Sequence, residues 1–373
     1  MGNRIVLILI ALALAAGAAA LYLLGGEGKS APAASAFGKP LFPQLKAAEV
    51  ARITIAEPQS TLNLEKKDGR WTIAERGGFP ADLDRVGELV VKIIELKTGQ
   101  SEPISEKERA RMQLGAPGKA EGAATLVSLK AQDGKVLAEL LVGKKYFRSP
   151  PEGDATKAQG DGRFVMLPAD PAHVIVVADP LRQVGSATAN WIAKEGFAIE
   201  NVKALEVKLA DGGYRLERAG IDAPWTLDGQ GGELDPARAS AAISALGKLE
   251  PEDAAVSDAD AGFEQGAQLN VATFDGLEYR LKVGRLDKQR HAVRGVVEGA
   301  LVRPAPPVPA SEKAEDKVKR EKALADAAKA FNERIAREKA LGPFTLLVAK
   351  ARLDDLLKQR QDLLKPEDKD AKK

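Results

Sequence analysis

The sequence predicts an α+β protein: an N-terminal transmembrane helix followed by two tandem copies of a mainly antiparallel sheet module, each with a packed helix. Three observations support this fold class. Residues 5–24 form an uninterrupted apolar run. A motif of Trp-Thr-aliphatic, Gly-Gly and Leu-Asp begins at Trp71 and recurs at Trp225. Short runs with alternating apolar residues, separated by turn sequences, surround both motifs and indicate strands.

The apolar run at residues 5–24 is long enough to cross a bilayer as a helix, which takes about 20 residues. Arg4 and the α-amino group favour a cytoplasmic N-terminus. We therefore expect a signal anchor at 1–26, a single-pass protein of the cytoplasmic membrane, and an extracytoplasmic location for the rest. A signal peptide cleaved near residues 34–36 and a buried soluble helix are the alternatives. Residues 27–44 contain Gly, Ala, Ser and Pro, as flexible tethers do.

Composition excludes several classes of protein. The net charge is +2, which argues against a general nucleic-acid binder. The chain has no cysteine, so disulfides, thiol catalysis, Cys-ligated metals and a lipoprotein anchor are excluded.

Each copy is expected to have the element order βββ-α-ββ-ββ, with the first copy at 45–190 and the second at 191–365. Period-two runs at 53–55, 62–64 and 71–73 predict the first meander, and runs at 205–209, 214–216 and 225–227 predict the second. Asp133-Gly134 and Asp275-Gly276 are Asp-Gly pairs between strands, which favour hairpins with type I′ turns.

A helix is expected after each meander because apolar residues recur at helical spacing. Asp235 followed by Pro236 is a strong helix start, and Asp84 aligns with Asp235 and is expected to cap in the same way. Catalytic carboxylates at these two positions are the alternative. Trp71 and Trp225 are expected to fill the space between sheet and helix, with an exposed ligand-stacking role as the alternative. The helical faces comprise Leu83, Val86, Val90, Ile93 and Ile94, and Ala239, Ala242, Ile243, Leu246 and Leu249.

These motifs together resemble the bacterial domain of unknown function 4340. The residues that carry the resemblance are Trp71, Asp84, Met112–Gly115 and Val142-Gly143 in the first copy, and Trp225, Asp235, Phe263–Gly266 and Val283-Gly284 in the second. The resemblance covers most of residues 45–300 and the C-terminal strand and helix. Pro117 fits the family pattern after the Gly link, whereas Gln268 departs from it in the second copy. Members are similar to single-pass anchored proteins encoded near ABC-transporter components like those of gliding motility. The resemblance thus implies ABC-type transporter subunits as partners and supplies no catalytic residue.

The second copy contains an insertion that the first lacks. Residues 311–341 are rich in Ala and mixed charges, with Ser311 as the expected cap and Gly342-Pro343 as the stop. We expect a helix of about 28 residues, about 40 Å long. It is either an arm that binds a partner helix or a solvated helix packed loosely on its own domain. The candidate partner-binding residues are Val318, Leu324, Phe331 and Ile335. A last helix is expected at 351–365, followed by a disordered tail at 366–373.

No catalytic constellation is present. His173 and His291 lie apart and are expected to be structural rather than ligands, and neither GxSxG nor a Walker A motif occurs. Residues 257–266 lack the ligands of an EF-hand. The sequence predicts no catalytic residue, cofactor or metal. The expected function is a non-enzymatic, membrane-anchored extracytoplasmic accessory or scaffold protein of a membrane complex. The alternatives are a glycan- or lipid-binding cleft between the copies and a divergent hydrolase.

Overall fold

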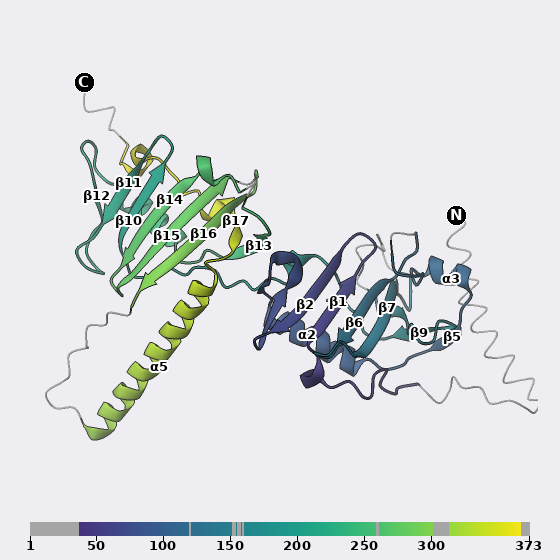
Figure 1. The fold of residues 1–373 in the computed structure, drawn as a ribbon. Coiled ribbons are helices and arrows are strands. Elements are labelled where there is room, and N and C mark those ends of the chain that lie inside the picture. Colours follow the sequence, from purple (N-terminus) through teal and green to yellow (C-terminus); the bar gives the residue numbers. More distant parts are fainter. Residues whose placement is uncertain are drawn as a thin grey trace, which may run out of the picture.

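The computed structural model describes residues 37–118, 121–150, 154, 158, 160–258, 261–285, 287–300 and 313–366. The predicted signal anchor, residues 27–36 of the predicted tether, Ser311 and the tail from residue 367 lie outside this part of the chain. Within it, no helix has the length and apolar character needed to cross a membrane. The described residues form an α+β protein with two mainly antiparallel sheets, drawn as ribbons in Figure 1.

The first sheet has nine strands in the order β4-β3-β2-β1-β6-β7-β8-β9-β5. Its helices are α2 (Leu83–Glu95) and α3 (Glu106–Arg111). Its strands are β1 (Arg52–Ala56), β2 (Thr61–Lys67), β3 (Arg70–Ile73), β4 (Phe79–Pro80), β5 (Ser101–Pro103), β6 (Thr125–Lys130), β7 (Val136–Tyr146), β8 (Gly162–Met166) and β9 (His173–Val177).

The second sheet has eight strands in the order β12-β11-β10-β14-β15-β16-β17-β13. Its helices are α4 (Pro236–Ala245) and the inserted α5 (Ala314–Ala340). Its strands are β10 (Val202–Leu209), β11 (Gly212–Glu217), β12 (Thr226–Leu227), β13 (Pro251–Ala255), β14 (Ala267–Thr273), β15 (Leu277–Arg285), β16 (Arg290–Gly299) and β17 (Thr345–Ala349).

The two sheets have the same topology, which confirms the duplication. Strand by strand, β3-β2-β1-β6-β7-β8-β9-β5 corresponds to β12-β11-β10-β14-β15-β16-β17-β13. The short strands β5 and β13, which follow the helices, are not in the predicted element order. Each crosses the module to pair with its last strand, so it lies at the far edge of the sheet.

The duplication also includes the segment that follows the last strand of each sheet, which we call the strap: residues 178–193 in the first module and 350–365 in the second. The first strap bonds to the entry of α2, since Trp191 O accepts from Asp82 N at 2.7 Å. The second bonds in the same way to the entry of α4, where Leu363 O accepts from Asp235 N at 2.9 Å. Each strap also forms a β-bridge beside this bond, Ala81 with Ile192 and Leu234 with Leu364.

The second strap corrects the predicted helix at 351–365. The chain there forms turns and two 3₁₀ segments, η5 (Lys350–Arg352) and η6 (Arg360–Leu363). Its leucines have helical spacing, but its carbonyls accept hydrogen bonds from other parts of the module. Tyr214 Oη donates to Leu356 O at 2.7 Å, and Arg238 donates to Leu364 O at 2.8 Å. Tertiary contacts therefore override the helical pattern.

The contacts of the first strap place the boundary between the modules later in the chain than predicted. Trp191 and Ile192 are buried in the first module, so its repeat ends after residue 193 and not at 190. At the other end, Leu41 N donates to Leu96 O at 2.7 Å, as Ile199 N donates to Leu246 O at 3.1 Å in the second module. Residues 38–44, assigned to the tether by sequence, thus belong to the first module. We take residues 38–194 as the first module and 195–366 as the second.

The helix starts agree with the prediction in one copy and not in the other. Asp235 caps α4 and accepts from Ala237 N at 2.9 Å. In α2 the cap is Asp82, which accepts from Arg85 N at 3.1 Å, so the assignment of the cap to Asp84 is wrong. The helix begins one residue before Asp84, because the strap fixes Asp82 at the entry. Leu83, expected in the core, is consequently 66% exposed at the first helical position.

The hairpin turns at the two Asp-Gly pairs differ from the predicted type. Gly134 and Gly276 have φ of 90° and 83°, but neither aspartate has a positive φ, which a type I′ turn requires. Gly134 N donates to Ala131 O and Gly276 N donates to Thr273 O. Each turn is therefore a type I turn closed by a left-handed glycine, and the register of the β6–β7 ladder shifts beside the first turn.

Gly143 and Gly284, the repeated Val-Gly glycines, are required by close backbone approach. A Cβ at Gly143 would clash with Met112 O, and a Cβ at Gly284 would clash with Ala261 O. In each module the link before β6 or β14 crosses the strand at this glycine.

We predict that Gly284→Ala lowers the free energy of unfolding by about 1–3 kcal/mol, because backbone must shift to admit the methyl group. Gly87→Ala is the matched control, since Gly87 lies within α2 with open space around its Cα. There the substitution should stabilise by about 0.5–1 kcal/mol. Urea unfolding of the purified chain measures both. Equal stability of Gly284→Ala and the unsubstituted protein would contradict the close-approach role.

Candidate interaction site at the junction and on helix α5

A bidentate ion pair joins the two modules. Arg76 ends the 3₁₀ segment η2 (Ala74–Arg76), and Asp253 lies on β13. Arg76 Nε donates to Asp253 Oδ1 at 2.7 Å, and Arg76 Nη2 donates to Oδ2 at 2.8 Å. Thr188 Oγ1, on the first strap, lies 3.4 Å from the same carboxylate. The two side chains are 23% and 13% exposed, so the pair is largely desolvated.

The electrostatics of this pair favour its charged form. Burial alone would raise the pKa of Asp253, but the hydrogen bonds from Arg76 and from the N–H of Ala254 lower it below its ordinary value. The hydrogen bond to Asp253 also raises the pKa of Arg76. Two parallel N–H···O bonds fix the relative orientation of the groups as well as their separation.

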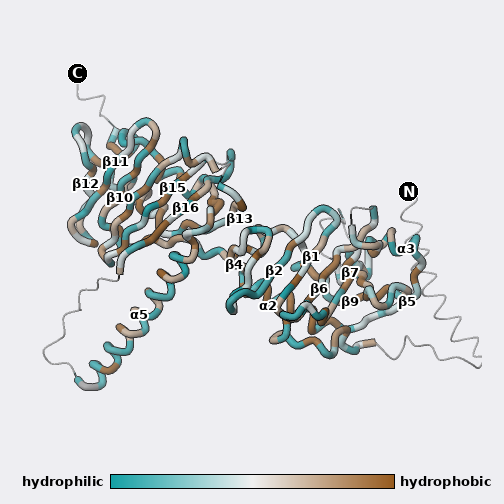
Figure 2. The backbone as a smooth tube through the Cα atoms, viewed as in Figure 1, coloured by the Kyte–Doolittle hydropathy of each residue, from teal (hydrophilic) through white to brown (hydrophobic). Residues whose placement is uncertain are grey.

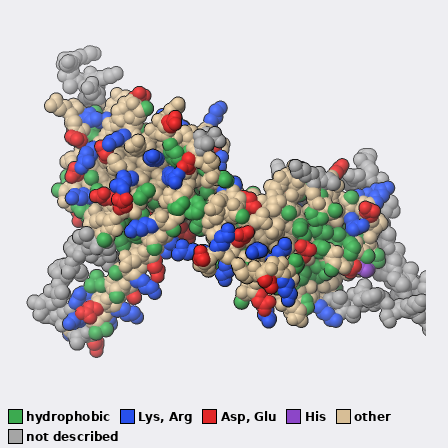
Figure 3. Space-filling view, viewed as in Figure 1, with side chains coloured by type: hydrophobic (Ala, Val, Ile, Leu, Met, Phe, Trp, Pro, Cys, Tyr) green, Lys and Arg blue, Asp and Glu red, His purple; other side chains and the backbone are tan. Residues whose placement is uncertain are grey.

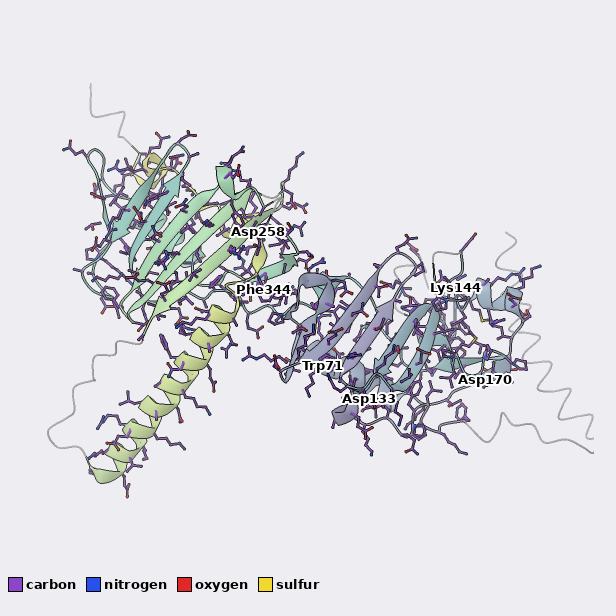
Figure 4. The ribbon with its side chains drawn as sticks, viewed as in Figure 1. Trp71, Asp133, Lys144, Asp170, Asp258 and Phe344 are labelled. Atoms are coloured by element: carbon purple, nitrogen blue, oxygen red, sulfur yellow. The ribbon has the colours of Figure 1, made fainter. Side chains whose placement is uncertain are left out.

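An aromatic contact lies beside the ion pair. Phe79 on β4 is fully buried and meets Phe344, the residue before β17, edge to face with ring centroids 5.0 Å apart. Figure 4 labels Phe344 at the point where the modules meet, and in Figure 2 the β4 and β13 edges face each other there. Apolar residues of both modules belong to one continuous core cluster.

The junction residues are those in which the copies differ. In the repeated motif, Gln230 stands at the position of Arg76, and Gly232 stands at that of Phe79 when the capping residues Asp82 and Asp235 are matched. His173, the first residue of β9, stands where the second module has Phe344 when the two sheets are matched through Arg163 and His291. Sequence reasoning missed the junction because it compared what the copies share. The differences between the aligned motifs were the available signal.

Helix α5 projects from the second module, away from both sheets (Figure 1). It runs from Ala314 to Ala340, close to the predicted 311–341, and its capping position is Lys313, whose side chain makes no cap bond. Lys317 and Glu321 form an i,i+4 pair at 4.0 Å. Figure 3 shows positive and negative side chains interleaved along the exposed helix, which suits a helix surrounded by water.

The last two turns of α5 hold it to the module. Ile335 is buried and Phe331 is half-buried against the core. Glu338 is only 2% exposed, and its carboxylate accepts from Tyr279 Oη at 2.8 Å and from Ala198 N at 3.2 Å. These contacts tie the helix to β15 and to the chain that enters the second module.

Burial disfavours the charged form of the Glu338 carboxyl group. Burial raises its pKa, and the hydrogen bonds from Tyr279 and Ala198 and the charge of Arg334 oppose that rise only in part. Arg334 Nε lies 3.8 Å from Glu338, too far for a hydrogen bond, while its Nη1 donates to Glu200 at 2.8 Å. Burial also raises the pKa of Tyr279, so its hydroxyl remains a donor.

The four candidate partner-binding residues do not form one surface. Ile335 is buried in the core and is not available to a partner, which corrects the prediction for that residue, and Phe331 is half-buried against the core. Leu324 is half-buried and continues their stripe outward. Val318 is 65% exposed but lies about 120° around the helix from Leu324, because six residues turn an α-helix by about 600°. The available part of the stripe is Leu324 with Ala328.

Trp71 and Trp225, the tryptophans of the repeated motif, are half-buried, which lies between a buried packing role and an exposed ligand-stacking role. Both pack on the edge of the core, and the guanidinium of Arg218 covers Trp225 at 4.6 Å from the ring centroid.

Asp258, in the loop rejected as a calcium site, pairs with Arg294 and Thr345. Among the described residues no group of three His, Cys, Asp or Glu side chains could hold a metal ion. His173 is half-exposed and pairs with Asp170 at 2.9 Å, whereas His291 is buried.

Comparison with known families agrees with the repeated motifs. The family model described as domain of unknown function (DUF4340) matches residues 71–266, just over half of the chain. The chain belongs to the DUF4340 family. No curated protein and no solved structure matches it. The DUF4340 match begins at Trp71 and ends at Gly266, so it contains both Arg76 and Asp253 and does not contain α5.

We predict that the Arg76–Asp253 pair contributes a coupling energy of about 1–3 kcal/mol. A double-mutant cycle of Arg76→Gln, Asp253→Asn and the double variant, followed by urea unfolding, measures it. The double variant should lose less stability than the sum of the losses in the two single variants, because each single variant leaves a desolvated charged partner without its counterpart. Strict additivity would show that the pair does not couple the modules.

The pair should also make the stability of the folded protein fall at acidic pH. Because the folded-state pKa of Asp253 is lowered, its stabilisation is complete above the unfolded pKa of about 3.9 and is lost as pH falls through the folded pKa. Asp253→Asn should flatten stability against pH below about pH 4 and leave the neutral region parallel to that of the unsubstituted protein.

Glu338 should change the stability with pH in the opposite direction. Its raised pKa means that stability falls as pH rises from the unfolded value, about 4.3, through the folded value. Glu338→Gln should abolish this slope and retain an acceptor for Ala198 N. Glu338→Ala should be less stable than the unsubstituted protein by about 1–3 kcal/mol, because it leaves the Tyr279 hydroxyl buried without a partner. Thermal unfolding between pH 4 and 8 compares them, and a Glu338→Gln profile with the original slope would refute the assignment.

Proposed function

We propose that this DUF4340 protein is a non-enzymatic accessory or scaffold protein, anchored in the cytoplasmic membrane with its two modules outside the cytoplasm. In this proposal its partners are subunits of a membrane complex, with an ABC-type transporter as the expected complex. The apolar run at residues 5–24 supports the anchor, and the interleaved charges of the chain support a protein rather than a nucleic-acid partner.

The observation that carries the proposal is the way α5 is held. A long helix that serves only its own module would bury a face along its length, yet α5 is anchored by its last turns and extends outward from them. Its stripe of Leu324 and Ala328 is a short apolar face that a partner helix can cover. The buried Glu338 network gives this face a fixed direction relative to the module.

The junction supports a scaffold in a second way. A desolvated bidentate ion pair and an aromatic contact constrain how the first module meets the second. A protein that holds two partners at a defined separation needs such a constraint, whereas a flexible pair of binding domains does not.

Detergent-solubilised native complexes provide the test. The tagged full-length chain should recover other membrane proteins, and Leu324→Asp should reduce that recovery at least tenfold. Val318→Asp is the matched control, because it places the same charge on the same helix about 120° away. Recovery of the unsubstituted chain alone would overturn the proposal, and equal loss in both variants would remove α5 from it.

Topology is tested separately, since the chain contains no cysteine. A single Ser257→Cys, at an exposed position of the second module, should react with a membrane-impermeant maleimide added outside intact cells. Reaction only after the cytoplasmic membrane is permeabilised would place the modules in the cytoplasm and contradict the proposed location.

A further inference from the structure

The two modules differ at one end of their cores, where β8 and β16 begin. Arg163 on β8 and His291 on β16 have corresponding roles: Arg163 Nη1 donates to Gly143 O at 2.9 Å, and His291 Nδ1 donates to Gly284 O at 3.1 Å. The acceptors are the two repeated glycines. Arg163 is long enough to reach the strap as well, where its Nε donates to Pro180 O at 3.0 Å.

In the second module this space remains partly open. A cavity of about 80 Å³ lies between the ends of the strands and the second strap. Its apolar wall includes Leu209, Val283 and Leu357, and its polar lining includes Gln265 and Gln359. A space of this size holds several waters or a small polar group, since one water needs about 10–15 Å³ by this measure. In the first module the longer Arg163 side chain bonds both to Gly143 O and to Pro180 O of the strap, and an arginine at position 291 is long enough to enter the cavity.

His291 has one ring nitrogen to offer to this cavity. Its side chain is 7% exposed and lines the cavity. Because a carbonyl oxygen only accepts, the bond to Gly284 O places a proton on Nδ1. No hydrogen bond within the described part of the chain uses Nε2. This nitrogen accepts in the neutral ring and donates once the ring is protonated.

The mouth of the cavity carries cationic groups. An adjoining depression of about 330 Å³ shares Arg285, His291 and Leu357 with the cavity and adds Lys350. Asp287 also lines this depression, but its carboxylate is occupied by the N–H groups of Gln289 and Arg290 and by the Arg290 guanidinium. Asp211 and Asp354, the other carboxylates of the lining, are exposed at the rim, as are Arg285 and Lys350.

We propose that this cavity binds the oxyanion group, phosphate or carboxylate, of a small molecule. Arg285 and Lys350 supply positive charge at the mouth, and the amide groups of Gln265 and Gln359 supply neutral donors. His291 Nε2 is a further polar group in the same lining. Charge-assisted hydrogen bonds from the two cationic groups are about twice as strong as neutral ones. The inner volume suits an oxyanion and a few attached atoms, and not a glycan chain or an acyl chain.

The chain contains only two histidines, so imidazole resonances offer a direct readout. We would titrate the full-length protein, labelled with ¹⁵N-histidine and held in nanodiscs, with inorganic phosphate and, in a second series, with acetate. Phosphate should shift the His291 nitrogen resonances, because the ring lines the cavity, and the shift should saturate in the millimolar range. His173, half-exposed on the other module, should not follow and serves as the internal control.

Two variants test the site itself. Arg285→Gln should weaken phosphate binding at least tenfold, whereas Lys282→Gln, on the same strand but not in the lining, should leave it unchanged. His291→Arg should fill the cavity, abolish phosphate binding and retain the unfolding temperature; binding to this variant is followed by calorimetry.

The two titrations distinguish a phosphate ligand from other oxyanions. Saturation with phosphate alone identifies a phosphate group, and saturation with both ions identifies any oxyanion. The proposal is overturned if the two histidines shift alike, if neither shifts, or if a folded His291→Arg protein binds phosphate as tightly as the unsubstituted chain.

Discussion

The hydrogen bond between the strap and the entry of the helix is the constraint on which the rest of each module depends. In both modules the N–H of the capping aspartate, Asp82 or Asp235, donates to the carbonyl of a buried apolar residue of the strap. This bond determines where the helix begins and closes the open side of the core. In the first module the strap then brings Thr188 to Asp253 at the junction. In the second, the strap is the wall against which the cavity beside His291 remains open.

Much of the fold followed from local patterns. The duplicated meander, the helix after it, the cap at Asp235 and the limits of α5 are all determined within a few residues, and the structure confirms them. The second strap was misassigned because Leu353, Leu356 and Leu363 have helical spacing, while the partners of its carbonyls lie more than a hundred residues away. Strands β5 and β13 were missed for a related reason, since a three- or five-residue strand at a sheet edge depends on its partner rather than on its own pattern.

The candidate interaction site was only partly predictable. The sequence located the projecting helix, but periodicity could not separate the turns that anchor it from those that remain exposed. Ile335 and Leu324 look alike in sequence, and only the position of the core decides that the first is buried. Likewise, Glu338 reads as one charge among many, although it is the side chain through which α5 meets Tyr279. The junction pair joins residues 177 positions apart, which no local pattern relates.

The insertion of α5 between β16 and β17 has a consequence for how the second module folds. In the first module the chain passes from Met166 to His173 between the corresponding strands, whereas in the second it passes from Gly299 to Thr345 before the sheet can continue. A longer loop loses more conformational entropy on closure, here by roughly 2 kcal/mol if the insertion were unstructured. Formation of α5 before β17 pairs would shorten the effective loop. The second sheet should therefore gain its last strands, β17 and β13, later than the first sheet gains β9 and β5.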